Sequence, residues 1–436
     1  MSYWQVAAGD GRRNYSEVFL KYGVMLIGPG DPGEYFQNEQ YYKNIYKPND
    51  ITVFAEQVKD GDIVVLKKPS GRLWEVLAVG TVRGDYVHLP VFDDVEGWDL
   101  QHCRYVKWIK PKSEKRITGL TRGTFKGINK QSTITTISSV LNSGIPLSFT
   151  QIPEPPKKLN DEDLIDILIN YGLRPKDAED FTQTIHRIRR LVKWYYSNGK
   201  DVKEHETRTF LIVPLLLALG WPEQKLKIEW NRIDIAFFEK PYSEENKNNE
   251  CVIILESKRL WEGLDYGASQ ASTYASRYPK CNRLIVSDGC CYKLFKRKGT
   301  TWHYSAYLNI LKPKPTHPYK PNVGGAPDVF SKFNGKVIIT DKARLHITRC
   351  KRLRFAPSKF YLRRTSFTPK PLASGAQTHR FGDGTTELPG CTDVTDSVLS
   401  SISSSIQCLT VIPPVTREIG RGSTYFDREA ASSRGS

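Results

Sequence analysis

Two apolar stretches carry the acidic residues that decide the fold: Arg232-Ile233-Asp234-Ile235-Ala236-Phe237-Phe238 and Val252-Ile253-Ile254-Leu255-Glu256-Ser257-Lys258. Both are short and rich in β-branched and aromatic residues, and the mostly polar segment between them predicts a β-hairpin. In a hairpin, the start of the first strand lies beside the end of the second. Asp234 and Glu256 are therefore expected to converge, and Lys258 to face the same way as Glu256, two residues before it.

This combination of side chains suits metal-dependent hydrolysis of phosphodiesters. Two carboxylates and a strand carbonyl are hard oxygen ligands, which Mg²⁺ prefers, and Mn²⁺ accepts the same ligands. A bound Mg²⁺ lowers the pKa of its water and neutralises charge that develops on a phosphate, while a lysine ammonium can stabilise the attacking water or a phosphate oxygen. The sequence therefore predicts Asp234 and Glu256 as metal ligands and Lys258 as a catalytic lysine.

The tripeptide acid-x-Lys alone does not identify such a site. It also occurs at Asp201-Val202-Lys203, Glu223-Gln224-Lys225 and Glu245-Asn246-Lys247. Glu256 differs because it ends a run of five apolar residues and has a partner strand that carries Asp234 upstream. The alternative interpretation is a surface salt bridge at a strand end, an arrangement that is common and weak.

The sequence around the hairpin strengthens the catalytic interpretation. The stretch from Glu206 to Trp221, most of it in an amphipathic helix predicted over Glu204 to Leu219, precedes the hairpin. Gln270-Ala271-Ser272-Thr273-Tyr274 and Ser287-Asp288-Gly289 follow it. Together these motifs resemble the N-terminal nuclease domain of type I restriction-enzyme R subunits, in the PD-(D/E)xK superfamily, over residues 201–313. Ile233 stands where that family usually has a proline before the first Asp.

The resemblance implies further site residues. Glu206 would be an additional acidic residue reaching the site from the helix, and Gln270 and Tyr274, four apart on one helical face, would position DNA or the lysine. The alternative for Tyr274 is packing on the sheet. No Gly-x-x-x-x-Gly-Lys-Ser/Thr phosphate loop occurs, so an ATP-driven motor and an ATP cofactor are not expected.

The first 112 residues predict a small β-barrel, because short apolar segments alternate with Gly and Asp turns. The segments 3–9 and 23–30 resemble the EVE-like branch of the PUA-like barrels, which are similar to readers of a flipped, often modified, base. Aromatic walls suit such a pocket, and Trp4 is the first candidate, followed by Trp74 and Trp98. The alternative role for each of these tryptophans is barrel core.

The overall organisation follows from these segments. We expect a barrel over 1–112, a linker over 113–160 ending in Pro153-Glu154-Pro155-Pro156, helices and a nuclease domain with a mixed sheet flanked by helices over 161–333, and a basic, disordered tail over 334–436. The fold class is therefore α/β plus β.

Composition sets the expected partners. The chain has 436 residues and a formal net charge of +17, which favours a polyanion such as nucleic acid. No run of 18 apolar residues and no signal-like start occur, so the expectation is a cytoplasmic protein without a membrane partner. The expected function is a restriction-type endonuclease acting on double-stranded DNA, with or without a modified base, and able to form a homodimer on it. The alternatives are a non-catalytic nucleic-acid-binding protein and an RNA nuclease.

Overall fold

A computed structural model describes residues 1–10, 12–44, 50–68, 74–199, 201–245, 250–265 and 267–333. The chain divides into two compact units, Met1–Ala356 and Pro357–Ser436, and all described residues belong to the first. The expected disordered tail over 334–436 lies outside the described residues. Within them, no helix has both the length and the apolar character to cross a membrane.

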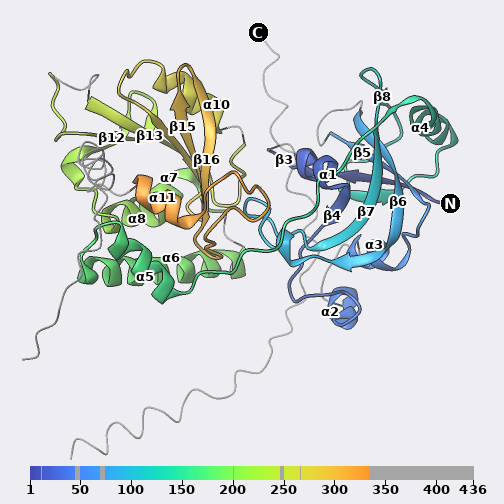
Figure 1. Cartoon of the computed structure of the whole chain (residues 1–436), viewed down its shortest axis with the longest axis horizontal. Helices are drawn as coiled ribbons and strands as arrows, with labels where there is room; N and C mark the ends of the chain where they lie inside the picture. Colours follow the sequence, from blue (N-terminus) through green and yellow to red (C-terminus); the bar gives the residue numbers. More distant parts are fainter. Residues whose placement is uncertain are drawn as a thin grey trace, which may run out of the picture. The chain divides into compact units, whose positions relative to one another are not determined.

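The N-terminal half of the described chain is built on an eight-stranded sheet that curves into a half-barrel (Figure 1). Its strands run in the order β10-β7-β6-β5-β1-β9, with β4 paired to β7 and β8 paired to β6. The strand bounds are β1 (Tyr3–Ala7), β4 (Val24–Ile27), β5 (Ile63–Lys67), β6 (Trp74–His88), β7 (His102–Lys110), β8 (Arg116–Ile117), β9 (Phe125–Gly127) and β10 (Ile145–Pro146). A separate short pair joins β2 (Gly9–Asp10) to β3 (Arg13–Asn14).

Four helices pack beside this sheet: α1 (Ser16–Tyr22), α2 (Glu39–Asn44), α3 (Asp50–Glu56) and α4 (Gln131–Ser143). The main core cluster of this half combines aliphatic and aromatic side chains, and Trp108, Phe19 and Phe54 are almost completely buried in it. A helical turn at Pro90–Phe92 precedes the loop that carries Glu96 and Trp98.

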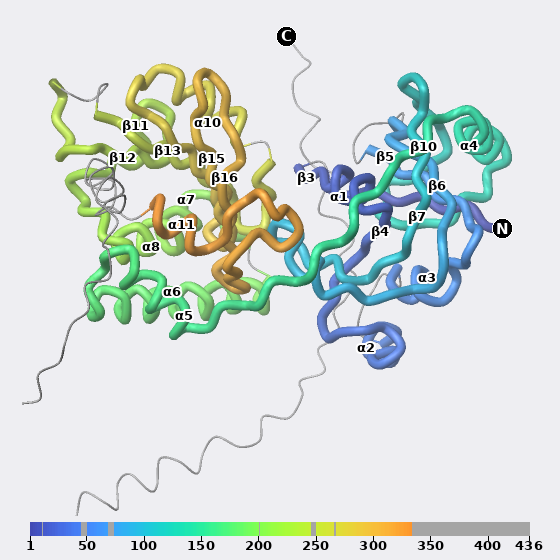
Figure 2. Tube along the Cα trace, in the orientation of Figure 1, coloured from blue at the N-terminus to red at the C-terminus, as the bar shows by residue number. Residues whose placement is uncertain are grey.

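The first sheet extends beyond the boundary expected at residue 112. β8, β9 and β10 all lie within the stretch expected to be a linker, and they pair with β6, β1 and β7. These strands have only two or three residues each, too few for an alternating pattern to be recognised. Residues 147–160, at the end of the expected linker, have no helix or strand and run as an extended segment (Figure 2).

The C-terminal half of the described chain is a six-stranded mixed sheet in the order β11-β12-β13-β14-β15-β16. Its strands are β11 (Leu226–Trp230), β12 (Ile233–Phe238), β13 (Cys251–Ser257), β14 (Arg283–Ser287), β15 (Cys291–Lys298) and β16 (Thr301–Asn309). β13 and β14 are parallel and the other neighbours are antiparallel. A parallel pair requires a crossover, and α10 (Gly267–Ala275) provides it.

Helices cover both faces of this sheet (Figure 1). On one face, α10 packs Ala271 and Ala275 against Ala236 and Ile254. The other face is covered by the remaining helices, which are α5 (Asp161–Asn170), α6 (Pro175–Ser197), α7 (Glu204–Thr207), α8 (Val213–Ala218) and α11 (Ala326–Phe333), together with a π-helical turn at Arg208–Ile212 and a 3₁₀ turn at Glu223–Lys225. The described chain is thus mixed α/β with several sheets, which agrees with the fold class predicted from the sequence.

Candidate active site

The hairpin expected from the sequence brings Asp234 and Glu256 together. β12 and β13 are antiparallel, with Ile235 opposite Leu255 and Ala236 opposite Ile254. The same register, continued by one residue, sets Asp234 opposite Glu256. Both are on the strand face that α10 covers, because side chains alternate along a strand and the next residues on that face, Ala236 and Ile254, pack against α10.

Asp234 is held from both sides by hydrogen bonds. Its Oδ2 accepts a bond from the Ser257 backbone N–H at 2.7 Å and from the Ser257 hydroxyl at 2.9 Å. Its Oδ1 accepts a bond from the guanidinium of Arg208 at 3.2 Å. Charge-assisted bonds of this kind are strong and directional, so the carboxylate has a fixed orientation at the end of the hairpin.

Glu256 and Lys258 form an ion pair at the end of β13. The Lys258 ammonium donates to Glu256 Oε1 at 2.7 Å, and only 3% of the Glu256 side chain and 15% of the Lys258 side chain are exposed. Lys258 itself is fixed because its backbone N–H donates to the Ser287 carbonyl. Gly267 leaves the room that Lys258 occupies, since a Cβ there would lie 3.3 Å from the Lys258 Cε and closer still to Val286.

A third carboxylate, Glu204, lies at the same place. It is the first residue of α7, and its Oε1 accepts a bond from the Ser257 hydroxyl at 3.4 Å. Burial raises the pKa of Glu204, and the charge of Asp234 raises it further, while Lys258 and Arg208 lower it. The helix therefore contributes an acidic group to the site, as the sequence predicts, but that group is Glu204.

Glu206, the acidic residue expected from the sequence, has a different partner. Its carboxylate accepts a bond from the Lys203 backbone N–H at 2.9 Å and caps the start of α7. No hydrogen bond or ion pair joins it to Asp234, Glu256 or Lys258 within the described chain.

The electrostatics of Glu256 are those of a crowded acidic site. Burial raises its pKa to about 7, with contributions from the charges of Asp234 and Glu204, although the hydrogen bond and charge of Lys258 act in the opposite direction. Burial lowers the pKa of Lys258, but the hydrogen bond and charge of Glu256, with Glu204 and Asp234, raise it overall. The site thus holds two cations, Lys258 and Arg208, against three carboxylates.

Arg208 is a residue that the sequence interpretation did not find. It begins the π-helical turn Arg208–Ile212, its side chain is 8% exposed, and it bridges Asp234 at 3.2 Å and Glu229 at 3.3 Å. π-helical turns inside α-helices are frequent at functional sites because they redirect a side chain. In the sequence, Arg208 stands between Thr207 and Thr209, just before the apolar run that begins at Phe210, and no local pattern distinguishes it.

The two helical candidates occupy different environments on α10. Tyr274 is partly buried and packs against the core cluster beneath the helix, which matches the structural alternative. Gln270 is exposed, one turn earlier. Neither has a hydrogen bond to Asp234, Glu256 or Lys258 among the bonds of the described chain.

The carboxylate oxygens of Asp234 and Glu256 are of the kind that divalent cations bind. No group of three or more His, Cys, Asp or Glu side chains in the described ranges has metal-binding geometry. Mg²⁺ is commonly bound through one or two carboxylates, with water and substrate phosphate completing its shell. Asp234 and Glu256 are such a pair, and after burial the charges of Asp234 and Glu204 contribute to the raised pKa of Glu256.

A separate cavity of about 480 Å³ opens beside the half-barrel, and Trp98 and Phe125 are among its aromatic walls. Its polar lining includes Asp99 and Thr124, and Trp261 also contributes to the wall. The volume is within the usual range for small-molecule sites, which combine apolar walls with a few polar groups.

Of the three tryptophans predicted for a base pocket, only Trp98 lines this cavity. Trp4 is buried, stacks on Phe125 with ring centroids 5.2 Å apart, and donates its Nε1–H to Asp62 at 2.9 Å. Trp74 is buried, donates to the Leu120 carbonyl, and carries the Lys67 ammonium over its ring. Trp4 and Trp74 therefore occupy the core positions that were the structural alternative.

The fold and the site together define a mixed α/β protein. It has a half-barrel and a separate sheet, and a cluster of carboxylates with a lysine lies at one end of that sheet. A family model described as a domain of unknown function (DUF8426) matches residues 4–138. The matched segment covers most of the first sheet, including β8 and β9 beyond residue 112. No curated protein matches the chain.

Proposed function

We propose that this chain is a Mg²⁺-dependent endonuclease of the PD-(D/E)xK type that hydrolyses phosphodiester bonds of double-stranded DNA. The observation that carries the proposal is the convergence of Asp234, Glu256 and Lys258 at the end of one hairpin, with Lys258 Nζ 2.7 Å from Glu256 Oε1. The decoy tripeptide Glu223-Gln224-Lys225 lies in a 3₁₀ turn instead, without a buried residue.

Each residue has a role in this proposal. Asp234 and Glu256, with Glu204 beside them, would hold Mg²⁺, which supplies charge neutralisation at the phosphate and a water of lowered pKa. Ser257 and Arg208 keep Asp234 oriented through the bonds described above. The Lys258 ammonium lies where it can donate a hydrogen bond to an attacking water or to a phosphate oxygen and stabilise its developing negative charge.

The half-barrel would select the DNA. We infer a PUA-like, EVE-like domain that takes a flipped base into the 480 Å³ cavity, against Trp98. A flipped base needs stacking surfaces and polar groups at its edge, and the cavity offers Trp98, Phe125, Asp99 and Thr124. A homodimer on DNA and a cytoplasmic location remain parts of the same proposal.

The experiment that tests the function uses the purified full chain with supercoiled plasmid, in unmodified, methylated and hydroxymethylated forms. We expect nicked and linear products with Mg²⁺ or Mn²⁺, no products with EDTA, no requirement for ATP, and at least about 10²-fold slower cleavage by Asp234→Asn. Double-stranded RNA of matched length serves as the competing substrate. Cleavage of RNA alone would favour the RNA nuclease, and binding of DNA without cleavage of any form would favour the non-catalytic alternative.

A further inference from the structure

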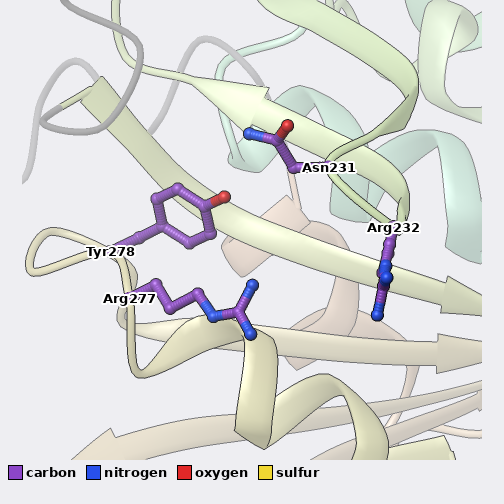
Figure 3. Close-up of a pocket in the computed structure, with 4 residues that line it drawn as sticks. All are labelled: Asn231, Arg232, Arg277 and Tyr278. Carbon is purple, nitrogen blue, oxygen red and sulfur yellow. The ribbon is translucent and has the colours of Figure 1, made fainter.

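An open cavity of about 560 Å³ lies at the turn between β11 and β12, lined by Asn231, Arg232, Arg277 and Tyr278. Figure 3 shows the side chains of both arginines reaching into it from two directions, Arg232 from the turn and Arg277 from the segment after α10. Both arginines are exposed. Within the described chain, no carboxylate lies within ion-pair distance of either guanidinium.

The two guanidiniums make the cavity a region of positive charge. Like charges that share one cavity repel each other, and an anion placed between them offsets that repulsion. Guanidinium forks also match the geometry of phosphate oxygens, to which they donate two parallel hydrogen bonds. The cavity is therefore suited to a phosphate group, and Asn231 is a further polar residue of its lining.

The turn that presents Arg232 has a conformation that disfavours arginine. Asn231 and Arg232 form a two-residue hairpin loop, because Trp230 pairs with Ile233, and their φ angles are 52° and 68°. Loops with two positive φ values favour Asn followed by Gly, since Gly has no Cβ to clash. A residue that breaks a local rule without a structural gain is a sign of function. Gly would suit this turn better but lacks the charge, so the charge of Arg232 is the property to explain.

One wall of the cavity is fixed, and the arginines lie on segments next to the candidate active site. Tyr278 is buried and its ring packs on Trp230 with centroids 5.2 Å apart, so this wall is fixed. Arg232 is two residues from Asp234, a span of at most about 7 Å along the chain. Arg277 follows α10, the helix that covers the face on which Asp234 and Glu256 lie.

We propose that Asn231, Arg232 and Arg277 form a binding site for a phosphate of the nucleic-acid backbone, next to the scissile phosphate. The identity of the polymer as DNA rests on the proposed function, but the phosphate site itself does not depend on cleavage. Its effect is to hold the strand in a fixed position relative to Asp234, Glu256 and Lys258.

The test measures the affinity of the full chain for a DNA duplex in EDTA over a range of salt concentrations. Arg232→Gly and Arg277→Ala should each weaken binding on the order of tenfold and reduce the slope of log affinity against log salt by about one. Arg232→Gly should keep or raise thermal stability, because Gly suits the turn. Arg277→Lys should retain the salt slope but lose affinity, because it keeps the charge without the fork.

The matched control is Arg190→Ala, an exposed arginine of α6, on the helix layer of the opposite sheet face. It should leave affinity and slope unchanged. Unchanged affinity and slope in both Arg232→Gly and Arg277→Ala would overturn the phosphate site while leaving the nuclease proposal intact. Weakened binding by both variants, together with a wild-type protein that never cleaves, would uphold the site and overturn the nuclease. A wild-type protein that binds neither DNA nor RNA would overturn both.

Discussion

Two buried glutamates, each paired with a lysine, have opposite electrostatics in this molecule. Glu96, in the loop before β7, forms ion pairs with Lys293 and with Lys320 at 3.3 Å, and His317 lies 3.8 Å away. Glu256 has only Lys258, and it shares its site with two other carboxylates. Both side chains are at most 5% exposed.

The difference appears in their pKa values. Burial alone would raise the pKa of Glu96, but the charges of Lys293 and Lys320 and the hydrogen bonds of His317 and Lys293 hold it well below its usual range. The pKa of Glu256 is raised to about 7, by burial first and then by Asp234 and Glu204. An anion with enough cations around it holds structure together, whereas an anion with too few is suited to bind an additional cation.

The largest effect expected from this comparison is on catalysis. Glu256→Gln removes one of the two predicted metal ligands while keeping the size of the side chain. We expect cleavage of plasmid in Mg²⁺ to slow by about 10²–10³-fold, with DNA affinity in EDTA within about twofold of wild type, because dispersed phosphate contacts set affinity. Glu256→Gln cleaving at the wild-type rate would contradict the assignment.

The equivalent change at Glu96 should affect stability. Glu96→Gln leaves the buried Lys293 with one carboxylate partner, Asp265, where it had two. Breaking a buried pair by removing one partner costs about 3–5 kcal/mol of unfolding free energy, which chemical denaturation can measure. Glu75→Gln, which breaks the exposed pair with Lys68, should cost at most about 1 kcal/mol. Equal effects of the two changes would show that the Glu96 cluster is not structural.

A third prediction concerns a buried group whose pKa is shifted by burial and not by an ion pair. His102 is fully buried without a charged partner; it accepts a hydrogen bond from the Tyr86 hydroxyl and donates one to the Pro29 carbonyl. Burial lowers its pKa to about 4, from an ordinary value of 6.5. Because the folded pKa is below the unfolded one, the stabilisation is present above pH 6.5 and is lost as pH falls toward 4.

The expected loss is up to about 3 kcal/mol over that pH window. Urea denaturation of wild type and His102→Gln at several pH values measures it, since Gln does not titrate. The slope of unfolding free energy against pH should be shallower in the variant between pH 6.5 and 4. Identical slopes would show that His102 does not stay neutral in the folded protein.

The smallest expected effect is at the aromatic cavity. Trp98→Ala removes a stacking surface worth about 1–3 kcal/mol per base, so discrimination between modified and unmodified DNA should fall about ten- to hundredfold. Trp4→Ala is the matched control, because Trp4 lies in the core and not on the cavity. It should lower the melting temperature and leave the preference unchanged. Loss of preference in Trp4→Ala alone would reverse this assignment.

The convergence of Asp234 and Glu256 was predictable because side chains alternate regularly along a strand and the two strands are consecutive in the chain. Glu204 was harder to predict, because the site uses the first residue of α7, and the π-helical turn that follows changes the helical period. The resemblance to the nuclease family implied Glu206 instead. It therefore pointed to the acidic helix but not to the residue that enters the site.

In the N-terminal half of the described chain, the tryptophans and the short strands show what local sequence patterns cannot predict. Successive side chains on a strand point to opposite faces, and the strand pattern alone does not say which face is core. The burial of Trp4 depends on Phe125 and Asp62, which lie far away in sequence. Trp98 is in a loop, where no periodicity applies. β8, β9 and β10 owe their pairing to strands distant in the chain, which local patterns cannot reveal.

The most direct test of the central claim compares two lysines in the same tripeptide pattern. Lys258 ends Glu256-Ser257-Lys258 on β13, and Lys225 ends Glu223-Gln224-Lys225 in a 3₁₀ turn. Single-turnover cleavage of plasmid in Mg²⁺ should fall about 10²–10³-fold in Lys258→Ala and remain at the wild-type rate in Lys225→Ala. Wild-type cleavage by Lys258→Ala, or equal loss in both variants, would contradict the assignment of this hairpin as the active site.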